Sequence, residues 1–215
     1  AVLDKPDDTP VTIADREAEA AMRAEIARAY PAHGIVGEEY GAERPEAEYV
    51  WFLDPIDGTK SFIAGLPLFG TLIGLARRGA PILGIIDHPA LNERWIGMRG
   101  RQTQFNGAPV HCRPCAHIQD AQLFSTDPEL FSGGEREAFR RVRAASKRVR
   151  YGADCYAYGL VASGFADLVV ESDLDATDFM ALAPVIDGAG GALRDWSGAA
   201  LTPTSTGQVI AVGDQ

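Results

Sequence analysis

The hydrophobic pattern of the first half of the chain predicts mainly strands. An uninterrupted apolar run from Tyr49 to Leu53 is typical of a buried strand, and it ends at Asp54. Farther along, short apolar runs alternate with Gly, Pro and Asn, as in an antiparallel meander. The strands expected in this meander cover residues 68–76, 82–87, 94–98 and 103–105.

Upstream of Tyr49 the pattern predicts one helix and one short strand. Helical periodicity extends through Tyr30. The apolar face expected for this helix consists of Ala18, Met22, Ile26 and Ala29. A short apolar strand, 35–36, follows, and Glu38 and Glu39 come directly after it. If this strand pairs with the one that ends at Asp54, one glutamate reaches the same place.

From about residue 120 onward, strand and helix patterns alternate. The expected strands are 121–125, 148–151, 167–171, 192–196 and 209–212. The expected helices are 134–145, 155–163 and 175–188. Such alternation is typical of an α/β layer. We therefore expect an α/β fold in one domain, 1–215, with an α+β subdomain at about 1–120 and an α/β subdomain at about 121–215.

The composition excludes some functional classes. The 215 residues include 20 basic and 30 acidic ones, for a net charge of −10. This charge argues against a nucleic-acid binder and against a protein of anionic membrane surfaces. No segment is long enough to span a bilayer, and no secretory signal is visible. The chain begins at Ala1 without Met and enters a charged loop, 5–10, so we expect that an N-terminal segment is missing.

The three cysteines form no disulfide framework, which favours a cytoplasmic location. Cys112 and Cys115 are flanked by His111 and His117, a spacing that admits a zinc site. Four local ligands do not by themselves converge on one ion, and a surface turn is the favoured interpretation.

The strongest candidate chemistry lies where the strand 49–53 ends. Asp54 and Asp57 would be delivered together to the C-terminal end of this strand, where open α/β sheets bind ligands. Two carboxylates this close repel each other unless a cation lies between them, and Mg²⁺ prefers oxygen ligands. Gly58 and Thr59 could then hold a phosphate. The alternative is a strand-end turn with two solvated aspartates.

Two further acidic positions carry the same ambiguity. Asp15 is either a residue that caps the first helix or part of the site, and the cap is favoured on sequence alone. Four acids lie between Glu171 and Asp178, which is typical of a solvated loop before a helix. The functional alternative places Asp178, at the helix start, against Asp54 and Asp57.

Taken in chain order, these elements resemble the inositol monophosphatase-like family of Mg²⁺-dependent phosphatases over essentially the whole chain. The motifs that carry the resemblance are Ala14-Asp15, Gly37-Glu38-Glu39, Asp54-Pro-Ile-Asp57-Gly58-Thr59, and Asp178 upstream of Gly190-Gly191. Within the family, residues 57–62, 150–158 and 173–179 look most like the histidinol-phosphate phosphatases. Thr177 stands where many inositol phosphatases have Trp, a departure that weakens an inositol assignment.

The resemblance implies a layered αβαβα sandwich of the inositol monophosphatase/fructose-1,6-bisphosphatase type, a homodimer, and two or three Mg²⁺ per site. The metal ligands it implies are Glu38, Asp54, Asp57, Asp178 and the Ile56 carbonyl. The catalytic residues it implies are Glu38 and Thr59, with Asp15 behind Thr59. The phosphate and substrate contacts it implies are Asp57, Gly58, Thr59, Arg150, Asp154, Glu171 and Asp178.

The implied activity is hydrolysis of L-histidinol phosphate by in-line attack of water, a step of histidine biosynthesis. The expected partners are a small phosphorylated substrate and a second copy of the chain, with neither nucleic acid nor membrane. One alternative is another phosphomonoester: inositol 1-phosphate, a sugar bisphosphate or a nucleotide 3′-phosphate. A second alternative is a regulatory protein that keeps the fold while its catalysis is incidental.

Overall fold

The computed structural model describes residues 2–4 and 10–214. The charged loop predicted at 5–10 lies outside the described residues except for Pro10. A short hairpin of β1 (Val2–Asp4) and β2 (Pro10–Thr12) precedes the main body of the fold. Within the described part of the chain, no helix is long and apolar enough to cross a membrane.

The first half forms an eight-stranded sheet in the order β10-β9-β8-β7-β6-β5-β3-β4. Its strands are β3 (Gly34–Gly37), β4 (Gly41–Glu43), β5 (Tyr49–Asp57), β6 (Gly70–Arg77), β7 (Ala80–His88), β8 (Glu93–Met98), β9 (Gln104–Phe105) and β10 (Ala108–Pro109). From β5 to β10, each strand pairs antiparallel with the next one along the chain, which confirms the meander predicted from residue 68 onward. Strand β3 pairs parallel with β5.

Strand β5 is longer than the apolar run predicts. It continues past Asp54 to Asp57, and its register against β6 shifts between these two residues. Pro55 lacks the N–H that a regular ladder requires, and a bulge accommodates it. The Pro55 carbonyl instead accepts the Thr71 hydroxyl at 2.8 Å. The bulge lies between the two aspartates that the sequence singled out.

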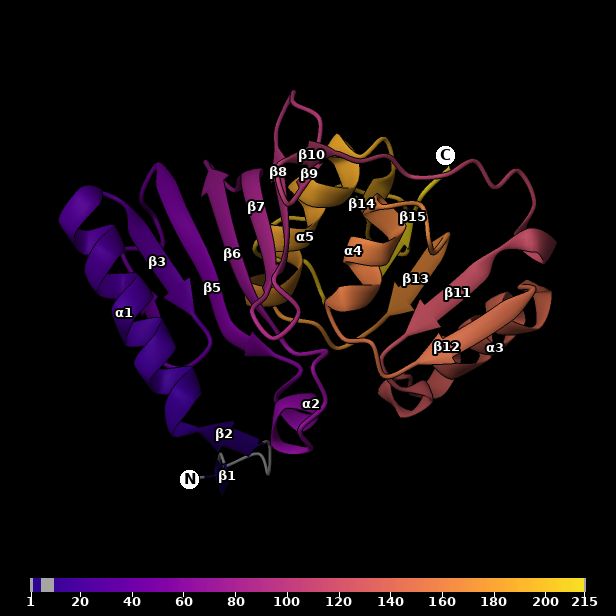
Figure 1. The fold of residues 1–215 in the computed structure, drawn as a ribbon, viewed down its shortest axis with the longest axis horizontal. Coiled ribbons are helices and arrows are strands. Elements are labelled where there is room, and N and C mark those ends of the chain that lie inside the picture. Colours follow the sequence, from indigo (N-terminus) through magenta and orange to yellow (C-terminus); the bar gives the residue numbers. More distant parts are fainter. Residues whose placement is uncertain (1, 5–9, 215) are drawn as a thin grey trace.

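Helix α1 (Ile13–Ala29) covers the outer side of this sheet next to β5 (Figure 1). Its N-cap is Thr12, in a capping box with Asp15, so the interpretation of Asp15 as a first-turn acid is confirmed. The predicted apolar face is wrong in part. Ile26 is buried, but Ala29 is exposed and the charged Glu19 is fully buried.

The second half forms a five-stranded mixed sheet in the order β12-β11-β13-β15-β14. Its strands are β11 (Gln122–Ser125), β12 (Arg148–Tyr151), β13 (Leu168–Glu171), β14 (Ala192–Arg194) and β15 (Val209–Val212). Two 3₁₀ turns, Ile118–Asp120 and Pro128–Leu130, flank β11. Helix α3 (Gly133–Ala145) packs on the outer face through Phe139 and Val142.

Between the two sheets lie α4 (Tyr156–Ala162) and α5 (Ala176–Gly188). Glycines on three neighbouring strands let α5 pack closely on the first sheet. A Cβ on Gly84, for example, would lie 1.8 Å from the Ala181 carbonyl oxygen. From left to right in Figure 1, the layers are α1, first sheet, α4 with α5, second sheet and α3. The fold is therefore the expected αβαβα sandwich.

Candidate metal centre

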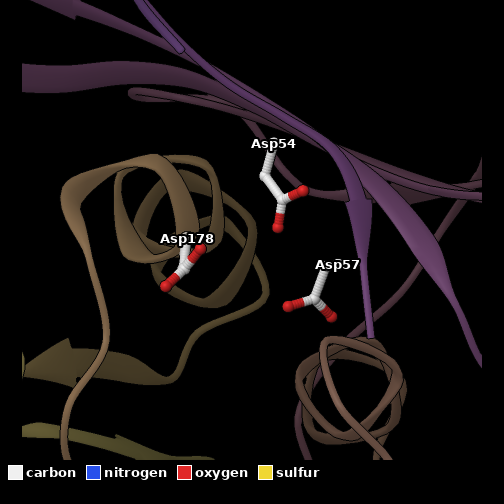
Figure 2. Close-up of side chains that lie close together, drawn as sticks. All are labelled: Asp54, Asp57 and Asp178. Atoms are coloured by element: carbon white, nitrogen blue, oxygen red, sulfur yellow. The ribbon is translucent and has the colours of Figure 1, made fainter. Parts of the chain in front are cut away.

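Three carboxylates from distant parts of the chain meet between the two sheets. Asp54 and Asp57 come from the bulged end of β5, and Asp178 comes from the first turn of α5 (Figure 2). One oxygen atom from each lies within 4.8 Å of the others. Within the described residues, no other set of three or more His, Cys, Asp or Glu side chains comes as close, and the zinc interpretation of Cys112 and Cys115 gains no support.

Each of these three carboxylates is oriented by one backbone N–H group. Asp54 accepts the N–H of Ile56 at 3.0 Å. Asp57 accepts the N–H of Cys155 at 2.6 Å, across the junction between the two halves. Asp178 accepts the N–H of Asp175 at 2.8 Å, in the capping box that starts α5. These bonds fix the side chains without supplying a positive charge.

The cluster is therefore electrostatically unbalanced. Burial raises the pKa of Asp54 well above its usual range, and the negative charges of Asp57 and Glu38 raise it further. Burial, followed by the charge of Asp154, raises the pKa of Asp57 to about 7. Burial and the charge of Asp57 likewise raise the pKa of Asp178. An all-oxygen, negatively charged site of this kind fits a hard divalent cation such as Mg²⁺.

Glu38 directly follows β3, beside the end of β5 that carries Asp54 and Asp57. Strand β3 pairs in parallel with β5 so that Gly37 is opposite Leu53, and the Glu38 N–H donates to the Leu53 carbonyl at 3.1 Å. The pairing on which the sequence analysis made the position of Glu38 conditional is thus present. Because the Glu38 charge raises the pKa of Asp54, the two carboxyl groups are close enough to interact.

The turn after Asp57 has the conformation that a glycine permits. Gly58 has φ 78° and precedes the short helix α2 (Thr59–Ile63), which the sequence pattern did not predict. The Thr59 hydroxyl donates to the Ile56 carbonyl at 3.0 Å. A carbonyl oxygen has two lone pairs, so this bond leaves Ile56 able to bind a cation as well.

The second half contributes a further carboxylate to this turn. Asp154 has φ 45°, and its Oδ2 accepts the Ser61 hydroxyl at 2.7 Å. A Cβ on Gly58 would lie 2.7 Å from the same Oδ2, so the carboxylate packs against the glycine. Sequence reasoning missed Ser61 and Cys155, although Ser61 belongs to the motif 57–62.

The other expected substrate residues differ in their surroundings. Glu171 is buried, and its carboxylate accepts bonds from the Thr126 N–H at 2.8 Å and the Tyr158 hydroxyl at 2.6 Å. Arg150 is exposed on the edge strand β12. Asp15 accepts the Thr12 N–H at 2.8 Å within its capping box. The substrate role of Glu171 and Arg150, and that of Asp15 behind Thr59, stay predictions.

Comparisons with known proteins find relatives over most of the chain. The profile of the inositol monophosphatase family matches residues 2–214. The bifunctional phosphatase IMPL2 of Arabidopsis thaliana, described as chloroplastic, is 55% identical over 92% of the chain, which spans 58% of that protein's length. A histidinol-phosphatase of Chlorobaculum parvum is 38% identical over 92% of the chain and 76% of its own length.

A solved structure shares the fold over nearly the same region. An inositol monophosphatase from Zymomonas mobilis superposes with a TM-score of 0.89 and 46% sequence identity. The match covers 94% of this chain and 78% of that one.

Proposed function

The chain belongs to the inositol monophosphatase family, and we propose that it hydrolyses L-histidinol phosphate to L-histidinol and inorganic phosphate. The proposal rests on the carboxylate cluster at the end of β5 and on the similarity to a protein named histidinol-phosphatase. The reaction consumes one water and breaks the P–O bond to the alcohol.

We assign two or three Mg²⁺ ions to the acidic cluster. Their ligands would be the carboxylates of Asp54, Asp57, Asp178 and Glu38, together with the Ile56 carbonyl. Such ions neutralise phosphoryl oxygens, acidify a bound water and stabilise the leaving alkoxide. Asp54 is buried and Asp57 and Asp178 are half-buried, which makes this cation charge more effective than it would be in bulk water.

The remaining steps are assigned to the chain's own groups. Gly58 presents a turn without a side chain, so the backbone there can approach the phosphate closely. Glu38 and the Thr59 hydroxyl orient the attacking water, and Asp15 supports Thr59. Positioning of this kind accounts for much of the catalysis of phosphoryl transfer, since the protein forms no covalent bond to the substrate.

The observation that favours histidinol phosphate is the carboxylate of Asp154 beside Gly58. Histidinol carries an ammonium and an imidazole, and a negative charge beside the phosphate-binding turn attracts the ammonium. Inositol has only neutral hydroxyl groups. We assign Asp154 to the ammonium, with Glu171 and Arg150 on the same alcohol side of the site.

The test is Mg²⁺-dependent phosphate release from histidinol phosphate, inositol 1-phosphate and fructose 1,6-bisphosphate. We expect kcat/KM for histidinol phosphate to exceed that for inositol 1-phosphate by at least about tenfold, which corresponds to about 1.4 kcal/mol. Asp154→Asn should remove most of this preference, whereas Asp120→Asn, at an exposed position, should not. Equal turnover of the two substrates by the wild type would contradict the proposal.

The second candidate is an inositol monophosphatase. It is favoured by the 46% identity to the Zymomonas mobilis enzyme, which exceeds the identity to the Chlorobaculum parvum histidinol-phosphatase. The same substrate panel separates the two candidates. A preference for inositol 1-phosphate that Asp154→Asn leaves unchanged would support this second activity.

A further inference from the structure

His88, the last residue of β7, is fully buried near the metal centre. Its Nδ1 lies 2.9 Å from the carbonyl oxygen of Phe69. A carbonyl can only accept, so Nδ1 carries the proton and Nε2 of the neutral ring is an acceptor. Burial lowers the pKa of His88, which keeps the ring neutral. Because the ring is buried, the hydrogen-bond donor to Nε2 must be another group of the core.

The donor that faces Nε2 is the thiol of Cys155, with Sγ at 3.5 Å. Cys155 is buried and immediately precedes α4. Its backbone N–H is the group that donates to Asp57 Oδ2 at 2.6 Å. One residue of the second half thus contacts His88 through its thiol and Asp57 through its backbone N–H, and the same thiol also interacts with the Asp57 carboxylate.

The residues on either side of Cys155 also contact the first half of the chain. The ring of Tyr156 packs edge-on against His88, with ring centroids 4.9 Å apart and an interplanar angle of 82°. Asp154 accepts the hydroxyl of Ser61. The space is tight: a Cβ on Gly70 would lie 2.7 Å from Cys155 Sγ and 2.9 Å from His88 Cε1. The position of Cys155 is therefore closely determined.

We infer that His88 is a positioning residue for the metal centre: through the Cys155 thiol it fixes the backbone N–H that orients Asp57. The inference rests on the metal-ligand role proposed above for Asp57. His88 contacts neither ion nor substrate in this assignment. Groups that orient metal ligands commonly contribute 10- to 100-fold to metal affinity, so the expected effect is measurable.

The competing interpretation is that His88 only fills space in the core. Both interpretations predict a loss of stability when His88 is replaced. They differ in metal affinity, because a space-filling residue has no reason to affect Mg²⁺ binding once the protein is folded.

The decisive measurement is Mg²⁺ affinity of the substrate-free protein by calorimetry, repeated with Mn²⁺ by electron paramagnetic resonance. His88→Phe keeps an aromatic ring but removes both ring nitrogens, and Cys155→Ala removes the thiol. We expect each to weaken metal binding by about tenfold. Cys155→Ser retains a donor to Nε2 and should stay within about twofold of the wild type.

The matched control acts at the other end of α4. Trp95 Nε1 donates to the Ser163 hydroxyl at 2.8 Å, and Ser163→Ala removes this bond without touching Cys155. It should lower the denaturation midpoint and leave Mg²⁺ affinity unchanged. Wild-type affinity in folded Cys155→Ala or His88→Phe would overturn the inference. A wild-type protein that binds no Mg²⁺ would overturn the proposed function itself.

Discussion

Two acidic regions with buried carboxylates lie near strands β3 and β5, and their negative charges are compensated in different ways. Glu19 of α1 is 0% exposed, but it forms an ion pair with Arg23 at 2.7 Å. It also accepts the N–H groups of Glu39 at 2.7 Å and Tyr40 at 3.2 Å. Asp54 is 2% exposed and lies among other carboxylates.

The difference shows that burial of an acid does not by itself indicate a metal site. A buried charge is costly unless it is paired and hydrogen-bonded. Glu19 meets this requirement within the chain, because the cation is supplied by the next turn of its own helix. The cluster of Asp54, Asp57 and Asp178 has backbone donors but no ion pair with any Lys, Arg or His among the described residues, and its raised pKa values reflect that deficit.

The comparison predicts the largest effect for Asp54→Asn. Asn keeps the oxygen that accepts the Ile56 N–H but removes one negative charge. We expect Mg²⁺-dependent phosphatase activity to fall by at least about 100-fold, since even residues that only orient a metal ligand contribute 10- to 100-fold. The metal-free protein should become more stable, because a repulsive buried charge is gone.

Activity assays and thermal denaturation in chelator check the two parts of this prediction. Asp120→Asn, on the surface beside Lys147, serves as the control with the same chemical change. An Asp54→Asn protein with wild-type activity would show that the cluster is not the metal centre.

Glu19→Gln tests the other side of the comparison. It leaves Arg23, whose side chain is only 16% exposed, without its ion-pair partner. Breaking a buried pair by removing one member costs about 3 kcal/mol or more, which urea denaturation can measure. Mg²⁺ affinity should be unchanged.

The same helix offers a matched control for Glu19→Gln. Glu25 pairs with Arg28 at the surface, where both side chains are more than two thirds exposed. Glu25→Gln should therefore change the free energy of unfolding by less than about 1 kcal/mol. Equal losses for both variants would mean that Glu19 has no special role in stability.

The sequence could predict the metal candidates because their signals are local. The apolar run before Asp54 indicates a strand, and Asp178 lies at the start of a strongly apolar helix. Both elements are present, although β5 continues past Asp54 to Asp57, and the conditional pairing that brings Glu38 near Asp54 is present as well. The five residues of α2 are too few to produce a recognisable helical period.

The remaining features depend on tertiary contacts that no local pattern encodes. Helical periodicity places Glu19 outside the apolar face of α1. Its burial could not be predicted from that pattern, because its partners Glu39 and Tyr40 come from another segment. The sequence around His88 gives no sign of a role near the metal centre, because its partner Cys155 lies 67 residues farther along the chain. The roles of Glu19 and His88 can be recognised only when the segments that carry their partners are also placed in the fold.

The smallest expected effect is a pH dependence of the stability that comes from Asp57. The pKa of Asp57 rises from 3.8 to about 7 in the metal-free folded state, so the folded protein binds more protons than the unfolded chain between these values. Stability of the metal-free protein is therefore greatest below the lower value and declines as the pH rises through about 7. A bound cation offsets the lost protons, so Mg²⁺ should stabilise the protein more at high pH.

Thermal denaturation with and without Mg²⁺ at about pH 5.5 and about pH 8 checks the direction of this pH dependence. The first pH lies between the unfolded and folded pKa values of Asp57, and the second lies above both. We expect the Mg²⁺-induced rise in Tm to be larger at the higher pH by at least about 3 °C, since 1 kcal/mol shifts Tm by about 2–4 °C at this chain length. Glu19→Gln should retain the difference, because Glu19 is not part of the carboxylate cluster, whereas Asp54→Asn should reduce it. An equal rise at both pH values would indicate that Mg²⁺ binds away from the cluster of Asp54, Asp57 and Asp178.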